Sequence, residues 1–170
     1  MRNKVLLIGL VCAAPLLLGT LAYYFKWDVG SSSNYGELLP PRPLAGPPFE
    51  KLRGKWVLVM ADASRCDAWC ERKIYYLHQL WRAQGKDMNR VDRLWLLTDE
   101  AKPRAELLPA IEGMRVERAP ALDVFPGAPA DHVYLVDPLG NLMLRWPRDA
   151  DPSRMLKDLQ RLLKVAPRTA

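Results

Sequence analysis

Hydrophobic residues in this chain follow two spacings, each typical of one kind of secondary structure. Short continuous apolar blocks are typical of strands buried on both faces, whereas apolar positions three or four residues apart are typical of helices packed on one face. The blocks that predict strands are residues 55–60, 93–98, 132–136 and 141–146. The spacings that predict helices run from about residue 69 to 85, over a short stretch at 104–108, and from 151 to just before 167. The predicted order is therefore β-α-β-α-β-β-α.

The connections between these elements predict a mixed sheet. Asp137-Pro-Leu-Gly140 has the residues of a tight hairpin turn, which makes the last two strands antiparallel. A helix joins the first two strands, and because such crossovers are right-handed, those strands are expected to be parallel. The predicted fold class is therefore α/β, with a central mixed sheet flanked by helices.

The first residues of the chain predict a membrane anchor. No charged residue occurs between Val5 and Phe25, and a helix of that length spans a hydrocarbon core of about 30 Å. Arg2 and Lys4 precede this run and favour a cytoplasmic N-terminus. We expect residues 1–27 to form a single transmembrane helix in the inner membrane, with the rest of the chain in the periplasm. A cleaved signal peptide is the alternative, although the apolar run is longer than is usual for one.

The composition changes after the apolar run. Residues 28–48 are rich in Gly, Ser and Pro, as in Ser31-Ser-Ser33 and Pro40-Pro41, which is typical of a linker. Residues 49–170 then form one predicted domain, which is long enough to bury a hydrophobic core without the support of disulfides.

The formal net charge of +6 raises the question of a nucleic-acid partner. Basic and acidic residues are interleaved, as in Arg115-Val-Glu-Arg118, and no arginine-rich tract with interleaved aromatic residues occurs. We therefore expect no nucleic-acid binding, and we interpret the charge as a solvated surface that anionic lipid can attract.

Two of the three cysteines form the candidate chemical site. Cys66 and Cys70 lie between the first predicted strand and its helix, where backbone N–H groups and the helix dipole favour a thiolate. Inside a regular helix their Cβ atoms would lie about 5 to 6 Å apart, too far for a disulfide, so Cys66 is expected on the loop. The pair can then form a disulfide or bind a soft metal ion, and a purely structural disulfide is the alternative. Cys12, in the apolar run, is expected to be inert.

The order of elements, with cysteines at the first strand-to-helix junction, resembles the thioredoxin-like fold. Within that fold, the Cys-x-x-x-Cys spacing on a membrane-anchored, outward-facing domain resembles the Sco/SenC family. The run Phe49-Glu-Lys-Leu-Arg-Gly-Lys-Trp-Val-Leu-Val59 also resembles the segment that leads into the first core strand of Sco proteins. The resemblance covers about residues 49–170.

The resemblance implies a copper site. Sco proteins bind copper through two cysteines and a distant histidine, and they help to build the copper A centre of cytochrome c oxidase as metal donors or as thiol reductants. By this similarity Cys66 and Cys70 would be the thiolate ligands and His132 the third ligand. Soft thiolates suit Cu(I), and an imidazole helps to hold Cu(II). The implied partners are the inner membrane and a cytochrome c oxidase subunit or another copper chaperone.

The sequence leaves other interpretations open. His132 can also be a hydrogen-bonded or solvated polar residue at the start of a strand. The pair can act as a thiol-disulfide oxidoreductase without stored metal, in which Cys66 attacks a client and Cys70 resolves the mixed disulfide. The domain can also be a degenerate thioredoxin-like scaffold that binds a membrane partner. The chain is then either an enzyme or an assembly factor that resembles a metallochaperone.

Overall fold

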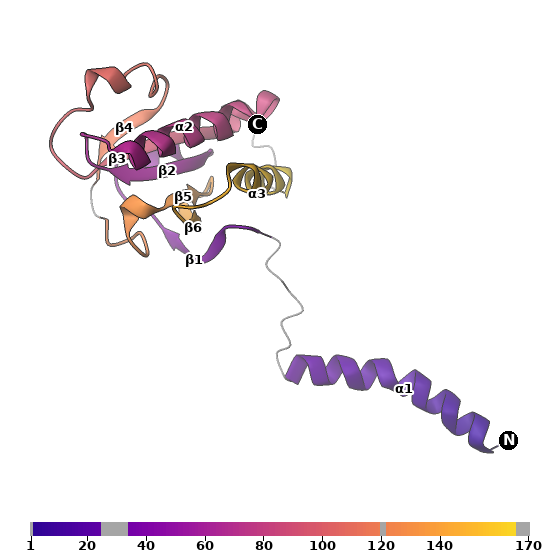
Figure 1. The fold of residues 1–170 in the computed structure, drawn as a ribbon. Helices are drawn as coiled ribbons and strands as arrows, with labels where there is room; N and C mark the ends of the chain where they lie inside the picture. The colour runs from indigo at the N-terminus through magenta and orange to yellow at the C-terminus, as the bar shows by residue number, and fades with distance from the viewer. Residues whose placement is uncertain (1, 25–33, 120–121, 166–170) are drawn as a thin grey trace. The chain divides into compact units, whose positions relative to one another are not determined.

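The structure is a computed structural model that describes residues 2–24, 34–119 and 122–165 (Figure 1). The chain divides into two compact units, Met1–Ser33 and Asn34–Ala170. The second unit holds the sheet and both cysteines of the candidate site.

In its described part the first unit is the helix α1 (Arg2–Tyr24), with Pro15 inside it. Among the residues that the structure describes, no helix has the combination of length and apolar character needed to cross a membrane. Residue 1 and residues 25–27 of the predicted anchor lie outside the described residues. The transmembrane helix predicted for residues 1–27 is not confirmed and stays a prediction, as does the location that depends on it.

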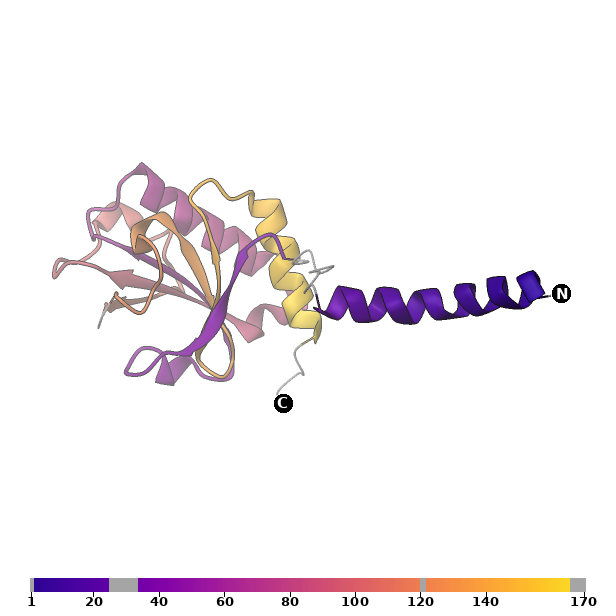
Figure 2. The ribbon, with the colours of Figure 1, turned by 90° about the horizontal axis from the view of Figure 1, so that it is seen from below.

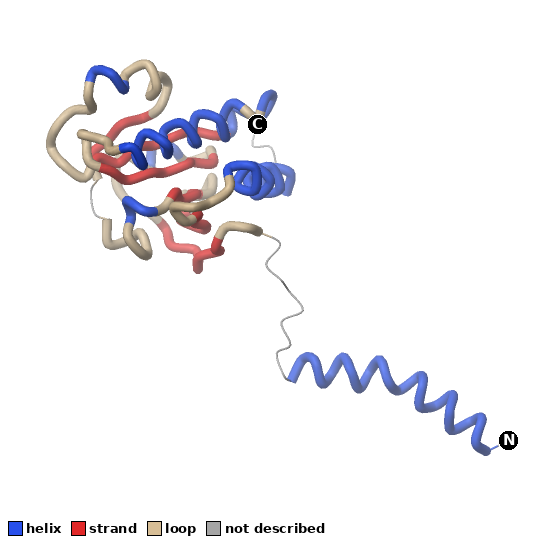
Figure 3. The backbone as a smooth tube through the Cα atoms, viewed as in Figure 1, coloured by secondary structure: helices blue, strands red, loops and turns tan. Residues whose placement is uncertain are grey.

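The described part of the second unit is built on a six-stranded mixed sheet in the order β1-β6-β5-β2-β3-β4. Figure 3 shows the strands in red. The strands are β1 (Glu37–Pro43), β2 (Trp56–Asp62), β3 (Val91–Leu97), β4 (Arg115–Arg118), β5 (Val133–Val136) and β6 (Asn141–Trp146). The helices are α2 (Ala68–Arg82) and α3 (Pro152–Val165), with short 3₁₀ turns η1 (Glu50–Leu52), η2 (Gly85–Arg90), η3 (Ala105–Leu107) and η4 (Pro129–Asp131). The parallel pairing of β2 with β3 and the antiparallel hairpin of β5 and β6 are confirmed.

Both α-helices of this unit, α2 and α3, cover the same face of the sheet (Figure 1). Side chains of β2 alternate, so that Met60 packs beneath the helices and Val59 packs on the opposite face. That opposite face is covered by residues 44–52 and 122–125 instead of an α-helix. Because both faces are covered, β2 is buried from Trp56 to Ala61, which explains its continuous apolar block.

The sequence predicts neither edge strand of the sheet. β1 lies inside the predicted linker 28–48, yet it pairs with β6 despite three prolines, because an edge strand needs hydrogen bonds on one side only. The backbone N–H of Leu44 donates to the carbonyl of Gly140, so the segment after β1 lies beside the β5–β6 turn (Figure 2). The predicted linker is therefore too long, since its second half belongs to the folded unit. β4 is short and mostly exposed, and so it has no apolar block to reveal it.

The connection between β3 and β4 also differs from the expectation. The helix predicted at residues 104–108 is only the turn η3, because Pro109 cannot continue a helix. Leu107, Ile111 and Met114 of this connection pack into the core that α2 also lines. The connection is therefore a packed segment beside the start of α2.

A buried carboxylate fixes the start of β1 against α3. Asp158 accepts hydrogen bonds from the backbone N–H groups of Tyr35 at 2.9 Å and Gly36 at 2.7 Å, and from Trp146 Nε1 at 3.0 Å. A Cβ atom on Gly36 would lie 2.5 Å from Leu144 Cδ2, so this approach requires glycine. Asp158, in α3, therefore binds both the two residues that precede β1 and the end of β6.

Replacing Asp158 by Ala should destabilise the protein strongly, because three donors, two of them in buried hydrogen bonds, lose their common acceptor. We expect the free energy of unfolding of the full-length protein to fall by about 3 kcal/mol, since each unsatisfied buried donor costs about 1 to 3 kcal/mol. Urea denaturation followed by tryptophan fluorescence measures it. Gln160→Ala, on the exposed side of the same helix, is the control and should change stability by less than about 0.5 kcal/mol. Equal stability of the two variants would contradict this role.

Candidate redox and metal-binding site

Cys66 and Cys70 form a disulfide at the junction between β2 and α2. The S–S distance is 1.98 Å and the two Cα atoms are 5.1 Å apart. Cys70 lies in the first turn of α2, whereas Cys66 precedes the residue that caps this helix. The structure therefore brings the two predicted cysteines together and places Cys66 on the loop, as the spacing predicts.

The backbone at Cys66 makes this disulfide possible. Its φ angle is +47°, and among the described residues it is the only residue other than glycine with a positive φ. The left-handed conformation is disfavoured for a residue with a side chain and persists only where other interactions hold it. The N–H of Cys66 donates to the carbonyl of Ala63 at 3.0 Å, which closes a turn before the helix. This turn departs from the helical path that would keep the two Cβ atoms too far apart.

Asp67 caps the helix that carries Cys70. Its carboxylate accepts from the backbone N–H groups of Trp69 at 3.0 Å and Cys70 at 2.9 Å. The bond from Cys70 is the main cause that lowers the pKa of Asp67, and the bond from Trp69 acts in the same direction. Two N–H groups of the first turn of α2 thus point toward the negative charge of the Asp67 carboxylate, which lies between the two cysteines in the sequence.

The two cysteines differ in their access to solvent. Cys66 is 5% exposed and Cys70 is 0% exposed. Both belong to the core cluster beneath α2, which also contains Leu107 and Ile111 of the β3–β4 connection. Both cysteines are therefore buried in the oxidised form, and the small exposure that the pair retains belongs to Cys66.

Arg104 joins the β3–β4 connection to the cysteine pair. Its Nη2 atom donates to the carbonyl oxygen of Cys66 at 2.9 Å and to Glu71 Oε1 at 2.6 Å. Sequence reasoning missed this residue, because the contact spans 38 positions and no spacing or motif points to it. Arg104 therefore brings a cationic side chain to the backbone of the loop cysteine.

A buried ion pair lies one helical turn beyond Cys70. Lys73, whose side chain is fully buried, pairs with Asp62 at the end of β2. Burial raises the pKa of Asp62 and lowers the pKa of Lys73, and in each case the bond to the partner opposes the effect of burial. Removing either partner would leave an uncompensated buried charge, so the pair ties α2 to the end of β2.

The segment before β5 lies against the same helix. The carbonyl of Ala130, in η4, accepts hydrogen bonds from Lys73 Nζ and from Trp69 Nε1, the latter at 3.0 Å. These contacts hold η4 beside the first turns of α2. They also account for the position of His132, which follows η4 directly.

His132 makes local contacts at the start of β5. Its Nδ1 atom lies 2.9 Å from the carbonyl oxygen of Ala128, and its ring centroid lies 5.8 Å from that of Tyr134. Among the described residues, no three or more His, Cys, Asp or Glu side chains form a group that can hold a metal ion. The structure thus does not assemble Cys66, Cys70 and His132 as one ligand set. In this conformation His132 is a hydrogen-bonded polar residue at the start of a strand, which is the alternative to a ligand role that the sequence leaves open.

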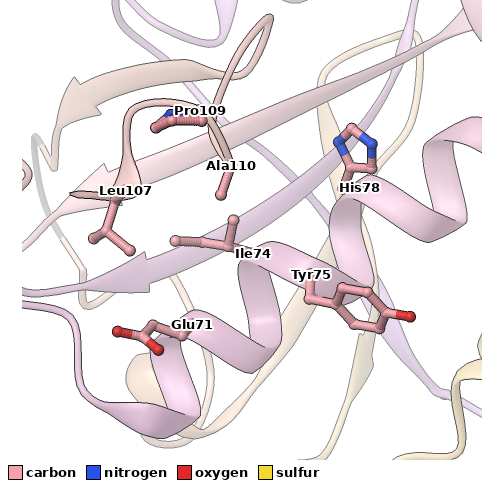
Figure 4. A pocket seen from close by; sticks show the side chains of 7 residues that line it. All are labelled: Glu71, Ile74, Tyr75, His78, Leu107, Pro109 and Ala110. Carbon is pink, nitrogen blue, oxygen red and sulfur yellow. The ribbon is translucent and has the colours of Figure 1, made fainter. Parts of the chain in front are cut away.

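A pocket of about 320 Å³ lies between α2 and the β3–β4 connection (Figure 4). It begins at Glu71, the ion-pair partner of Arg104, and ends at His78. Burial and the nearby Arg93 guanidinium lower the pKa of His78, whose Nδ1 lies 3.1 Å from Arg93 Nη1. The lining residues are Glu71, Ile74, Tyr75, His78, Leu107, Pro109 and Ala110.

Comparison with known proteins agrees with this architecture. The family model described as transmembrane-like, thioredoxin-like, C-terminal domain matches residues 56–166. The chain belongs to this family. The match covers the segments that contain Cys66, Cys70 and His132, and it confirms the thioredoxin-like fold predicted from the sequence. No curated protein matches the chain.

Solved structures of Sco proteins are structural neighbours of this family member. Yeast Sco1 with copper bound has a TM-score of 0.58 at 16% identity, and the match covers 81% of this chain and 97% of that one. Apo Sco1 from Thermus thermophilus has a TM-score of 0.54 at 18% identity, with 78% and 99% covered. ScoI from Bradyrhizobium japonicum with copper bound has a TM-score of 0.51 at 19% identity, with 66% and 88% covered. The predicted resemblance to Sco/SenC proteins is thus present in structure, and at these identities it is a likeness of fold.

Two substitutions of Asp67 should separate the contribution of its capping hydrogen bonds to stability from the contribution of its charge. Asp67→Ala removes the acceptor for two N–H groups and should lower the free energy of unfolding by about 1 kcal/mol at pH 7, whereas Asp67→Asn keeps an acceptor and should cost less. Because the pKa of Asp67 is lowered from its usual 3.8, the stability that its charge contributes is present above that pH and is lost as the pH falls through the lowered value.

Urea denaturation of the three full-length proteins at pH 7 and at pH 3 measures both effects. The difference in stability between the natural protein and Asp67→Asn should shrink at the lower pH. A difference that grows on acidification would contradict the assigned direction of the pKa.

Proposed function

We propose that this domain is a thioredoxin-like thiol protein whose Cys66–Cys70 pair alternates between disulfide and dithiol by exchange with a cysteine pair of a client protein. The observation that carries the proposal is the closed disulfide at the start of α2, with Cys66, which keeps a slight exposure of 5%, on the loop and the fully buried Cys70 in the helix. Such a short disulfide loop constrains the unfolded chain little, which favours a chemical role over a structural one.

The exchange follows from the positions of the two sulfur atoms. In the reduced protein, the thiolate of Cys66 attacks a sulfur of the client disulfide, and the other client sulfur leaves as a thiolate and takes up a proton. The thiolate of Cys70 then attacks Cys66 Sγ, which forms the internal disulfide and releases the second client sulfur as a thiolate that is also protonated. Two electrons and two protons pass from the pair to the client, and the reverse sequence oxidises a client dithiol.

Trapping the mixed disulfide tests this order of events. In a full-length Cys12→Ser background, reduced Cys70→Ser should retain one peptide per chain after mixing with a synthetic peptide that carries an internal disulfide, because the resolving thiol is missing. Cys66→Ser should retain at least tenfold less, because its remaining thiol is buried. Mass spectrometry under non-reducing conditions measures the adduct.

The protein with both cysteines is the matched control, and it should reduce the peptide and retain none. Equal trapping by the two serine variants would contradict the assigned roles of Cys66 and Cys70. No adduct with either variant would favour the degenerate scaffold that the sequence leaves open.

Binding of copper by the reduced pair is the second candidate function. It is supported by the Cys-x-x-x-Cys spacing and by structural neighbours whose solved structures contain copper. The residues of this chain fit two thiolate ligands for Cu(I), a soft ion, only after the disulfide is reduced. They do not form a three-ligand set in this conformation, because among the described residues no three His, Cys, Asp or Glu side chains form a group that can hold a metal ion.

Metal titration of the reduced full-length protein tests the copper candidate. One equivalent of Cu(I) should bind tightly, and the double variant Cys66→Ser Cys70→Ser should lose this binding because both soft ligands are gone. If His132 moves to complete the site, His132→Ala should weaken Cu(II) at least tenfold more than Cu(I). Unchanged Cu(II) affinity would remove His132 from the site, and unchanged Cu(I) binding by the double variant would exclude the cysteines.

The place of action is a further part of this proposal. Residues 1–27 would anchor the domain in the inner membrane and hold it in the periplasm, where disulfides persist. The support is the uncharged run from Val5 to Phe25 with Arg2 and Lys4 before it. The client would be a cytochrome c oxidase subunit or another copper chaperone, as the resemblance to Sco proteins implies.

A further inference from the structure

Arg104 contacts the redox pair through the backbone of Cys66. The guanidinium binds the carbonyl oxygen of the one non-glycine residue that holds a left-handed conformation within the described parts of the chain. Glu71, one residue after Cys70, binds the same Nη2 atom at 2.6 Å and so fixes the guanidinium from the helix side. Arg104 therefore spans the two halves of the disulfide loop.

The left-handed conformation of Cys66 needs support. The left-handed conformation is sterically unfavourable for a residue that has a Cβ atom. The next residue, Asp67, is also fixed, because it adopts the extended conformation of a helix cap. Three interactions hold Cys66 in place: its disulfide, the bond from its N–H to Ala63, and the bond from Arg104 to its carbonyl. Reduction removes the first of them and frees Cys66 to relax toward negative φ.

We propose that Arg104 is a positioning residue for the redox pair: by holding the carbonyl of Cys66 it stabilises the turn that the closed disulfide requires, and so it favours the disulfide over the dithiol. This inference rests on the proposed exchange for its biological use. Its physical content is that the bond from Arg104 is stronger in the oxidised protein than in the reduced protein. A bond of equal strength in both forms would stabilise the fold without affecting the redox equilibrium.

The contacts of Arg104 also hold the β3–β4 connection, which forms one wall of the pocket. Arg104 directly precedes η3, whose Leu107 faces Ile74 and Glu71 of α2 across the pocket (Figure 4). The guanidinium thus ties the β3–β4 connection to α2 at the end of the pocket nearest to the disulfide.

Redox equilibration of the full-length protein in glutathione buffers tests the proposal. Arg104→Gln removes the charge-assisted bond to Cys66, and we expect the equilibrium to shift about tenfold toward the dithiol, which is about 30 mV for a two-electron couple. Arg118→Gln is the matched control. Arg118 also donates to a backbone carbonyl, that of Glu100, and pairs with the carboxylate of the same residue, so its loss should shift the equilibrium less than twofold.

Thermal unfolding of the oxidised and reduced forms separates positioning from general stabilisation. A strong phosphine reductant prepares the reduced form, so this measurement does not require client exchange. Arg104→Gln should lower the melting temperature of the oxidised form more than that of the reduced form. Equal losses in both forms, or an unchanged glutathione equilibrium, would overturn the inference.

Glu71→Gln provides a second variant in case Arg104→Gln does not fold. It keeps Arg104 and removes the anion that fixes it, so it should shift the equilibrium in the same direction by a smaller factor. No shift with Glu71→Gln would count against the inference. If peptide trapping fails while these shifts occur, the proposed exchange is wrong and the role of Arg104 is supported. If trapping succeeds and the shifts are absent, the exchange is supported and the role of Arg104 is wrong.

Discussion

The chemistry of this domain depends on one backbone turn, the left-handed conformation of Cys66 between β2 and α2. Without that turn, a spacing of four residues in a helix would keep the two sulfur atoms apart. With it, Cys70 can remain in the first turn of α2 under the cap of Asp67, while Cys66 stays on the loop. Around this point, Arg104 binds the carbonyl of Cys66, and the Asp62–Lys73 pair joins the end of β2 to α2. Segments distant in sequence therefore hold a very local reaction site.

Much of the fold could be predicted from the sequence because its central strands are buried on both faces. The apolar blocks of β2 and β3 and the spacing in α2 and α3 carry that information directly. The edge strands could not be predicted in the same way. β1 contains three prolines and resembles a linker, and β4 exposes most of its few residues. Their positions follow from hydrogen bonds to neighbouring strands, which leave no pattern in hydrophobicity.

The site shows the same division between local and distant information. The cysteine pair and its loop position follow from local spacing, whereas Arg104 reaches the site from 38 positions away. Lys73 was missed although a sign of it exists, since it lies at the core-facing spacing of α2, three residues after Cys70 and beside Ile74. A lysine at such a position predicts a buried partner, and Asp62 is that partner. For His132 the structure shows the local bond to Ala128 and no metal-binding group among the described residues, and no pattern in the sequence predicts this arrangement.

The proposed chemistry requires Cys66 and Cys70 to form a reversible disulfide in the folded protein. Alkylation of the native full-length protein, followed by mass spectrometry of its peptides, tests this most directly when it is done before and after mild reduction. We expect a linked, unmodified pair before reduction, two alkylated cysteines after it, and the linked pair again once the reductant is removed and an oxidant is added. Two freely alkylated cysteines in the oxidised sample, or a disulfide that is reduced only when the protein unfolds, would show that the pair is not a reversible disulfide of the folded protein.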